Sequence, residues 1–597
     1  MAIRRFWVTL GAIGWILLAP LFLTGCQPAI LKTQAAQASQ IVLAILSDPK
    51  TFNPILNQEF PHIFLFAFEG LTKEDGISGE VQPALAESWT ISPDRRRVTF
   101  TLRENLQWSD GHPLTADDVV FTYGEVLFNP DIPSDQKDPL RIGESGAFPT
   151  VRKLSDRAVE FTLPEPFAPF LRATSNIWLV PAHILRPTVE QRNRDGDPLL
   201  ISTWNTGTNP ANIVTNGPYL IESYDPSQRV VFRRNPYYWR RDDQGNRLPY
   251  IDRIVWQVVE STDTQLLQFR SGKLDIMGDS RPVRSEYFSL LKREEQRGRF
   301  TLEVGGPWSG TTFLSFNLNR ATNERGQPLV DPIKSKWFNT PEFRQAVAYA
   351  LNRDAMVNNV FRGVGVIQNS PVSVQSPYFL TPEAGLKVYD YDPEKAKRLL
   401  ESVGFQYNTQ GQLLDADGNR VRFTLLTNSG NKNREGMGVQ IRQDLSKIGI
   451  QVDFQPIAFN TLVSRLTNSR DWDAHIIGFT GGVEPHSTAN LWTSTGGSHN
   501  FNLGPQPGQP PIQGWEVSDW EREIDRLFIA GAQELDETRR KAIYAEFQRI
   551  AQEQLPLIYL VNEVALMAVR DRVTNLKYSG LPTWGLWNIY ELQLAEN

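Results

Sequence analysis

Two adjacent carboxylates, Asp117 and Asp118, have a spacing that could support acid and base chemistry in an active site. They directly follow Thr115 and precede apolar residues. A hydroxyl followed by acids is typical of a helix N-terminus, where carboxylates complement free backbone N–H groups and the positive end of the helix dipole. The pair therefore predicts a helix start, and we expect no catalytic residue here.

Histidine provides the other chemistry to consider, because it is a common metal ligand. The chain has six histidines, and none forms a His-x-x-x-His pair. His475, His486 and His499 are close in sequence and could meet a metal or a metal chelate, but their spacings match no standard helix or turn. The Gly-x-Ser-x-Gly, phosphate-loop and dinucleotide motifs are also absent. We expect no enzyme, no resident metal and no cofactor.

The only cysteine, Cys26, follows a basic start at Arg4 and Arg5 and an apolar stretch at 6–23. Leu-Thr-Gly-Cys at 23–26 places small residues before a scissile bond, as in an export signal. The segment resembles the signal of bacterial lipoproteins, which implies that residues 1–25 are removed and that Cys26 carries a lipid. A permanent membrane anchor is the alternative. Residues 26–40 are rich in Ala and Gln and predict a tether.

Charge and hydropathy restrict the partners of the remaining chain. Losing Arg4 and Arg5 with the leader takes the formal net charge from −6 to −8, so nucleic acid and anionic lipid are poor partners. No later segment has the roughly 18 apolar residues that a spanning helix requires. We therefore expect a soluble body attached to a membrane only through its N-terminal lipid.

Strand and helix signals alternate along the body. An apolar run at 41–46 predicts a buried strand, and the alternation at 97–103 predicts a half-buried one. Residues 421–427, 434–448 and 450–455 predict a strand, a helix and a strand, which form a parallel βαβ unit. The C-terminal part predicts helices at 520–533 and 536–553 and a strand at 555–560.

Cap residues fix the start of three helices. We expect Thr115, Thr340 and Asp392 to cap helices with their side chains, and proline follows the last two directly, at the first helical position. Asp110-Gly111 predicts a tight turn just before the first of these helices.

An ordered series of motifs runs along the chain: Ala86-Glu87-Ser88-Trp89, Phe100-Thr101-Leu102-Arg103, Trp108-Ser109-Asp110-Gly111, Asn216-Gly217-Pro218-Tyr219, Arg234-Asn235-Pro236-Tyr237-Tyr238-Trp239, Gly272-Lys273-Leu274-Asp275 and Asn352-Arg353. In this order they resemble the extracytoplasmic solute-binding proteins of family 5, the peptide, nickel and opine receptors of ABC importers, and the resemblance covers nearly all of the mature chain. Each motif alone has a structural explanation in burial or turn formation. Together they point to the scaffold and leave the solute open.

The resemblance implies an α/β fold of the periplasmic binding protein type II kind, with two lobes, a hinge and an inserted extra domain. Lobe I is expected at 41–75, 213–310 and 561–597, the extra domain at 76–212 and lobe II at 311–560. Proteins of this kind close their lobes over a ligand, and the closed form meets a permease. The implied partners are a small-molecule or peptide ligand, ABC permease subunits and a membrane, with the protein a monomer in the cell envelope.

Candidate ligand contacts are loops at strand ends that face the crevice, as in other open α/β sheets. They are Asn53, Trp308, Ser309, Gly310, Phe479, Thr480, Gly481, Gly482, Glu484 and Asn500. For the 308–310 segment a plain turn with a core tryptophan is an equal alternative, and for Asn500 a surface turn is the simpler interpretation.

In peptide-binding relatives the loop at 479–485 resembles an aromatic residue, an aspartate that pairs with the peptide ammonium, and an acid-proline pair. Here Gly481 takes the aspartate position, while Glu484-Pro485 matches the final pair. An ammonium without an opposing charge loses several kcal/mol on desolvation, so a free peptide N-terminus is less secure as ligand unless Glu484 supplies the charge. Oligosaccharides, metal chelates, a receptor-like sensor or chaperone without import, and a hydrolase stay open as alternatives.

Overall fold

The structure is a computed structural model, and it describes residues 39–56, 63–143, 145–323, 325–506, 509–582 and 584–595. The predicted leader, Cys26 and nearly all of the tether lie outside these residues. The described chain from Gln40 onward belongs to one compact unit.

A mixed sheet near the N-terminus has the strand order β1-β10-β9-β8. The strands are β1 (Gln40–Ile45), β8 (Tyr219–Asp225), β9 (Arg229–Arg234) and β10 (Arg253–Val258). β1 pairs with β10 in parallel, and its apolar run is buried at alternate and then consecutive positions. The predicted buried strand at 41–46 is therefore confirmed.

An antiparallel sheet in the order β4-β5-β7-β6 is built from the segment between β1 and β8. Its strands are β4 (Ala86–Ile91), β5 (Arg97–Leu102), β6 (Thr150–Ser155) and β7 (Ala158–Thr162). Val98, Phe100 and Leu102 of β5 are buried, while the residues between them are more exposed, as the alternation predicted. Beside this sheet, α3 (Ala116–Val120) starts at Thr115 with a capping box that includes Asp118. The helix-start interpretation of the two aspartates is confirmed.

A third sheet has the order β18-β17-β19-β13-β20. Its strands are β13 (Thr311–Phe316), β17 (Arg422–Asn428), β18 (Gln451–Ile457), β19 (Ala474–Phe479) and β20 (Leu557–Tyr559). β17 and β18 are parallel and are joined through α12 (Lys432–Ser446), which confirms the βαβ unit. Gly449 ends this helical segment in the left-handed region, at φ +74°.

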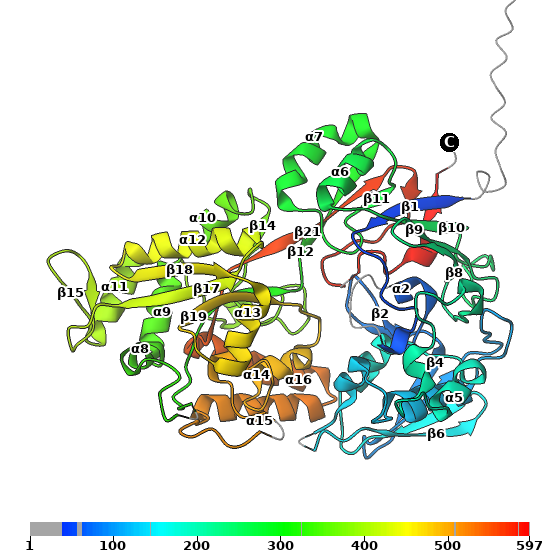
Figure 1. The fold of residues 1–597 in the computed structure, drawn as a ribbon, viewed down its shortest axis with the longest axis horizontal. Coiled ribbons are helices and arrows are strands. Elements are labelled where there is room, and N and C mark those ends of the chain that lie inside the picture. Colours follow the sequence, from blue (N-terminus) through cyan, green and yellow to red (C-terminus); the bar gives the residue numbers. More distant parts are fainter. Residues whose placement is uncertain are drawn as a thin grey trace, which may run out of the picture. The chain divides into compact units, whose positions relative to one another are not determined.

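Two long strands, β12 (Phe300–Pro307) and β21 (Val561–Arg570), run side by side and antiparallel (Figure 1). β12 leads directly into β13, and β20 leads directly into β21, so the chain passes twice between this ladder and the third sheet. The short strands β11 (Ile276–Met277) and β14 (Gly365–Ile367) also pair with β21. This arrangement suits a hinge, although the lobe and domain limits given above stay predictions.

Helices cover the sheets, and Figure 1 shows α12 beside β17 and β18. The remaining helices are α2 (Phe64–Ala67), α4 (Phe170–Ala173), α5 (Ala182–Glu190), α6 (Thr262–Arg270), α7 (Phe288–Gly298), α8 (Pro332–Phe338), α9 (Pro341–Ala350), α10 (Arg353–Asn359), α11 (Pro393–Ser402), α13 (Phe459–Ser464), α14 (Ala489–Trp492), α15 (Asp519–Gln533) and α16 (Glu537–Gln554). Small ladders are formed by β2 (Thr72–Glu74) with β3 (Val81–Pro83), β15 (Gln406–Tyr407) with β16 (Leu413–Leu414), and β22 (Val573–Thr574) with β23 (Gln593–Leu594).

Cap predictions were right for Asp392, which accepts a hydrogen bond from the Lys395 N–H at the start of α11. At α9 the helix start and Pro341 were right, but the cap was wrong. The Thr340 hydroxyl makes no cap hydrogen bond and instead donates to the Lys336 carbonyl at 2.8 Å. The preceding helix α8 supplies that acceptor, so the hydroxyl points backwards along the chain.

Candidate functional site

A main cavity of about 920 Å³ is bounded by segments far apart in sequence. One wall comes from residues 65–84 and 169–178, and the facing wall comes from the loop at 480–490 after β19. Residues 581–590, near the C-terminus, complete the lining. A volume in this range is typical of small-molecule and peptide sites. The main cavity is therefore the candidate site.

Four predicted contacts lie on the lining of this cavity: Thr480, Gly481, Gly482 and Glu484. β19 ends at Phe479, so the strand delivers this loop to the cavity edge. The loop also packs against the segment before β13. A Cβ atom on Gly481 would lie 1.9 Å from the Ser309 carbonyl oxygen, so the close approach of the two backbones requires glycine. Two predicted segments thus meet here.

The other residues of these segments have mainly structural contacts. Phe479 stacks on Phe313 with ring centroids 5.9 Å apart, and with Ser309 it lines a small hollow of about 20 Å³ beside the main cavity. Trp308 is half-buried and donates its backbone N–H to the Glu563 carbonyl, and Gly310 accepts a hydrogen bond from Asn562. Trp308 and Gly310 therefore belong to the link between β12 and β13 and do not line the cavity.

Glu484 is buried and its charge is already paired. Its carboxylate accepts hydrogen bonds from both terminal nitrogens of Arg540, at 2.6 and 2.8 Å, and it also accepts one from the His486 backbone N–H. The last bond caps the 3-10 turn Pro485–Thr488. Glu484 thus serves as a cap and as a buried ion pair, which leaves little of its charge for a ligand ammonium.

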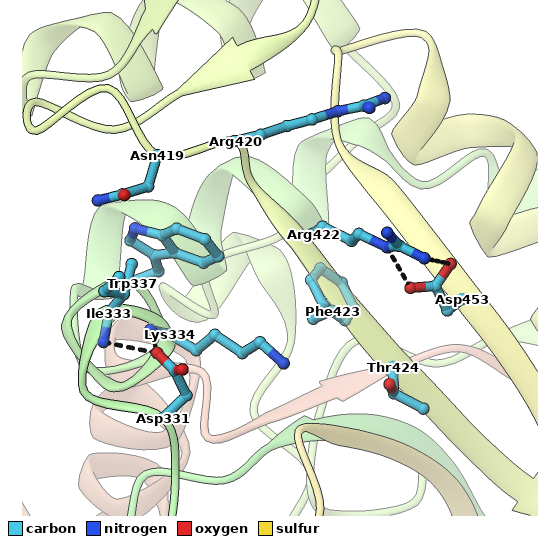
Figure 2. A pocket seen from close by; sticks show the side chains of 10 residues that line it. All are labelled: Asp331, Ile333, Lys334, Trp337, Asn419, Arg420, Arg422, Phe423, Thr424 and Asp453. Carbon is cyan, nitrogen blue, oxygen red and sulfur yellow. Dashed lines mark hydrogen bonds and ion pairs between the residues drawn. The ribbon is translucent and has the colours of Figure 1, made fainter.

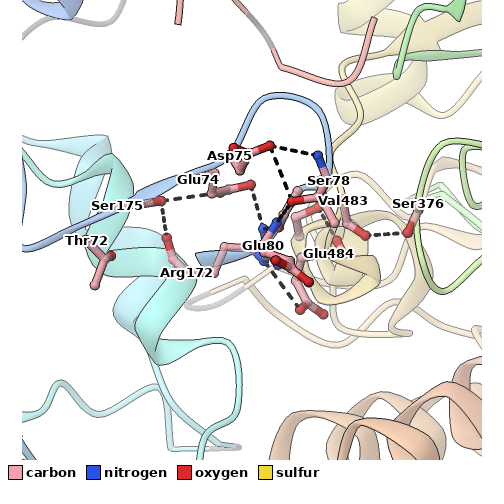
Figure 3. Close-up of polar contacts among 12 residues, drawn as sticks. Thr72, Glu74, Asp75, Ser78, Glu80, Arg172, Ser175, Ser376, Val483 and Glu484 are labelled. Atoms are coloured by element: carbon pink, nitrogen blue, oxygen red, sulfur yellow. Dashed lines mark hydrogen bonds and ion pairs between the residues drawn. The ribbon is translucent and has the colours of Figure 1, made fainter. Parts of the chain in front are cut away.

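A polar chain crosses the cavity wall from β2 to the 480–490 loop (Figure 3). Arg172 donates to the Glu74 carboxylate at 2.6 Å and to the Gly79 carbonyl at 2.7 Å. Its Nε also lies 4.0 Å from Glu484 Oε2. Burial raises the pKa of Glu74, and the neighbouring Arg172 opposes that rise. Arg172 therefore places a positive charge beside both acids of this wall, Glu74 and Glu484.

Two predicted contacts are outside the cavity lining. The Asn53 side-chain amide donates to the Leu200 and Thr203 carbonyls, at 3.0 and 3.2 Å, and its oxygen accepts from the Ile55 N–H, so it holds a loop. Asn500 is 7% exposed and starts a 3-10 turn. It is buried, which contradicts the surface-turn interpretation.

Sequence reasoning missed the aromatic side of the cavity. Its members are Trp178, Trp584, Trp587 and Tyr590. Lys73 lies beside two of them, Trp587 and Tyr590. The one available signal was the pair of tryptophans three residues apart near the C-terminus, which periodicity alone could not place. The tertiary fold brings them to β2, more than 500 residues earlier in the chain.

The three clustered histidines do not share a site. His475 packs against Trp472, His486 packs against Phe167 and Phe528, and His499 hydrogen-bonds Glu521 at 2.9 Å. Burial lowers the pKa of His475 to about 3 and that of His486 to about 4. Within the described part of the chain, no group of three His, Cys, Asp or Glu side chains is placed to hold a metal ion.

A smaller hollow of about 260 Å³ lies between α8 and the β17–β18 edge (Figure 2). Arg422 pairs there with Asp453 at 2.6 Å, and Asp331 caps α8 through the Ile333 N–H. Lys334 pairs with Asp473 at 2.7 Å. Each of these charged side chains has a partner within the protein, so the hollow is a weaker candidate than the main cavity.

Fold and cavity together are those of a two-lobed solute-binding protein. The chain matches the model of the bacterial extracellular solute-binding proteins, family 5 Middle, over residues 80–502. A probable ABC transporter-binding protein of Deinococcus radiodurans is 31% identical over 546 residues, which is 88% of this chain and 87% of that protein. The chain therefore belongs to the family 5 extracellular solute-binding proteins.

Solved structures show the same fold. The oligopeptide-binding protein AppA of Bacillus subtilis, in complex with a nonapeptide, aligns with a TM-score of 0.68 and 23% identity, over 94% of this chain and 99% of AppA. The periplasmic binding protein MelB of Agrobacterium fabrum, in complex with stachyose, aligns with a TM-score of 0.71 and 22% identity, over 94% and 85% of the two chains. The predicted periplasmic binding protein type II fold is confirmed.

Among the helices that the structure describes, none is both long and apolar enough to span a bilayer.

Proposed function

We propose that this protein is the substrate-binding lipoprotein of an ABC importer, which captures an oligopeptide or a similar small solute and delivers it to a membrane permease. The observation that carries the proposal is the cavity of about 920 Å³, whose walls come from β2 and α4 on one side and from the loop after β19 on the other. A solute that contacts both walls stabilises the closed arrangement. Membership of family 5 supports the same function.

Hinge closure is supported by how the chain crosses between the β12–β21 ladder and the third sheet. The crossings β12 to β13 and β20 to β21 are short, and Gly306, at the end of β12 just before the first crossing, lies in the left-handed region at φ +81°. Small backbone rotations at such positions can move two packed bodies relative to one another. We propose Trp308, Ser309 and Gly310 as part of this link, and Thr480, Gly481 and Gly482 as ligand contacts through their backbones.

Lipid attachment at Cys26 is the second part of the proposal. It rests on the Leu-Thr-Gly-Cys motif behind the apolar leader. Expression in a bacterial host with radiolabelled palmitate should label the wild type and leave Cys26→Ala unlabelled. Label on the alanine variant, or a leader retained on the mature wild type, would contradict lipidation at this residue.

An oligosaccharide is the second candidate solute, favoured by the tryptophans that line the cavity, since sugar rings pack on flat apolar faces. The stachyose complex of MelB shows that the fold can hold a sugar. A metal chelate has less support because the clustered histidines are apart. A sensor or chaperone without import predicts a bound-form partner other than a permease, which pull-down from membranes would identify.

Titration of the purified protein with peptide and oligosaccharide sets tests the binding function. Tryptophans in the cavity wall should report saturable fluorescence changes, and small-angle scattering should show a smaller radius of gyration with the bound solute. A saturating ligand that leaves the scattering curve unchanged would contradict closure. Turnover of the ligand would instead favour a hydrolase.

A further inference from the structure

Lys73 lies on β2 and lines the cavity beside the aromatic residues near the C-terminus. Its ammonium donates to the Tyr590 hydroxyl at 2.5 Å and lies 5.2 Å from the Tyr590 ring centroid. The Trp587 ring centroid is 5.9 Å away. Aromatic faces attract a cation but do not neutralise it. The residue is half-buried and belongs to the lining of the cavity.

The carboxylates that line the cavity have partners of their own. Glu74 is paired with Arg172, Glu484 with Arg540, and Asp138 with Arg141 at 3.3 Å. The fourth acid, Glu69, accepts hydrogen bonds from Tyr238 at 2.6 Å and Trp239 at 2.7 Å and lies 3.6 Å from Arg240.

Lys73 differs from the two arginines of the lining. Arg172 and Arg141 each have a carboxylate partner, at 2.6 and 3.3 Å. No carboxylate oxygen of the described residues lies within 4.0 Å of the Lys73 ammonium. A partly desolvated charge without a counter-ion is unfavourable, and an anionic ligand group would supply the missing partner.

Among the described residues, the cavity offers no comparable partner for a positively charged group of a ligand. Gly481, at the position where the resemblance implies an aspartate, cannot carry a side chain because the Ser309 carbonyl occupies the space. Glu484 is already bound to Arg540 in two hydrogen bonds. A ligand ammonium in this loop would therefore find no free carboxylate. The cavity suits a solute that is recognised by its acid group.

We propose that the ammonium of Lys73 binds a carboxylate of the solute, whose body packs against the neighbouring indole of Trp587. This inference rests on the proposed binding function and narrows its substrate class to carboxylate-bearing solutes, including peptides whose N-terminus is blocked. Lys73 is then a specificity-determining residue of the cavity.

The electrostatic surroundings agree with this assignment. Burial, and to a smaller extent the positive charge of Arg240, lowers the pKa of Lys73 to about 8, although Glu69, Glu591 and Asp75 act in the opposite direction. A bound carboxylate would favour the charged form and raise this pKa. Affinity for the acid should therefore decrease as pH rises through about 8, because the neutral amine must first take up a proton.

Matched acid and neutral probes test the proposal. The probes are tri- to pentapeptides as free acids and as C-terminal amides, each with a free or an acetylated N-terminus, together with trigalacturonic acid and its methyl ester. Dissociation constants are measured by tryptophan fluorescence and calorimetry at neutral pH. We expect the acid to bind about tenfold or more tightly than its neutral partner, and acetylation to change affinity much less.

Three variants assign the preference to one residue. Lys73→Met keeps the aliphatic stem and should bind acid and neutral probes alike, while Lys73→Arg should keep the preference. Lys577→Met is the matched control, because Lys577 also lies 5.9 Å from the Trp587 ring centroid but is paired with Glu591 at 2.8 Å. It should behave as wild type.

The outcomes separate the two proposals. An acid preference that persists in folded Lys73→Met, or equal binding of acid and neutral probes by wild type, would overturn the role of Lys73 and leave the receptor function intact. Folded wild-type protein that binds none of the probes in any form would overturn the proposed function for peptides and oligosaccharides, and this inference with it.

Discussion

The carboxylate of Glu484 and the guanidinium of Arg540 form a bidentate ion pair, with Oε1–Nη2 at 2.6 Å and Oε2–Nη1 at 2.8 Å. Both side chains are 6% exposed. The pair joins the loop at the cavity to α16, and Arg540 also donates to the Gly531 carbonyl and the Tyr378 hydroxyl. The position of the ligand-facing loop therefore depends on a charge contributed 56 residues later.

Arg540→Met should strongly destabilise the protein, because it leaves Glu484 buried without its counter-ion. Breaking one side of such a pair costs about 3–5 kcal/mol. The measurement is the free energy of unfolding from urea titration. Arg539→Met is the matched control, since the Arg539 side chain is 61% exposed and its pair with Glu534 should contribute little. Equal effects of the two substitutions would show that Glu484 finds another partner.

Gly481→Ala should destabilise the loop at the cavity. Its Cβ would lie 1.9 Å from the Ser309 carbonyl oxygen, and because that atom is backbone, the strand link must move. Overpacking of this kind costs about 1–3 kcal/mol. Gly482→Ala is the control one residue later, where the nearest atom is the Ser487 hydroxyl at 3.6 Å. If Gly481→Ala left the free energy of unfolding unchanged, the close approach of Gly481 to the Ser309 carbonyl would be disproved.

Local signals were the part of the fold that the sequence could predict. Asp392 caps α11 because its partner, the Lys395 N–H, is three residues away, and the βαβ unit around α12 is likewise contained in one short stretch. Thr340 was mispredicted because another local acceptor, the Lys336 carbonyl four residues earlier, takes its hydroxyl. Propensity identifies such residues, but their side chains can bond backbone groups on either side, and the sequence pattern does not say which.

The site depended on long-range contacts and could be predicted only in part. The 480–484 loop was found because it follows a strand end, a local feature. Lys73 was missed because its neighbours Trp587 and Tyr590 lie at the opposite end of the chain. Asn53 had the right local pattern, a polar residue after a strand. Its side-chain amide, however, donates a hydrogen bond to the distant Leu200 carbonyl.

Thr115→Ala should cost about 1 kcal/mol, because the hydroxyl caps α3 by accepting from the Asp117 N–H at 3.2 Å. Thr340→Ala should cost less, since its hydroxyl makes no cap bond at α9. Urea unfolding of the two variants gives the comparison. If both variants lost the same free energy of unfolding, the Thr340 hydroxyl would contribute as much as a cap, as first predicted.

Asp279 should make stability depend on pH in the mildly acidic range. The side chain is 2% exposed, and burial raises its pKa from 3.8 to about 6, although the Ser280 hydroxyl donates to it at 2.8 Å. Between these two values the folded state holds a proton that the unfolded state has lost. The contribution of Asp279 to stability is therefore greatest below about pH 3.8 and is lost as pH rises to about 6.

Comparing the wild type with Asp279→Asn isolates this contribution, because asparagine does not titrate and the other groups of the protein are common to both. The difference in unfolding free energy, wild type minus variant, should fall between about pH 4 and pH 6 and then stay level. Asp571→Asn makes the same change at an exposed position and is the matched control for the substitution itself. A difference that rises with pH over the same window would mean that Asp279 is stabilised as the anion in the folded protein, through hydrogen bonds strong enough to outweigh its burial.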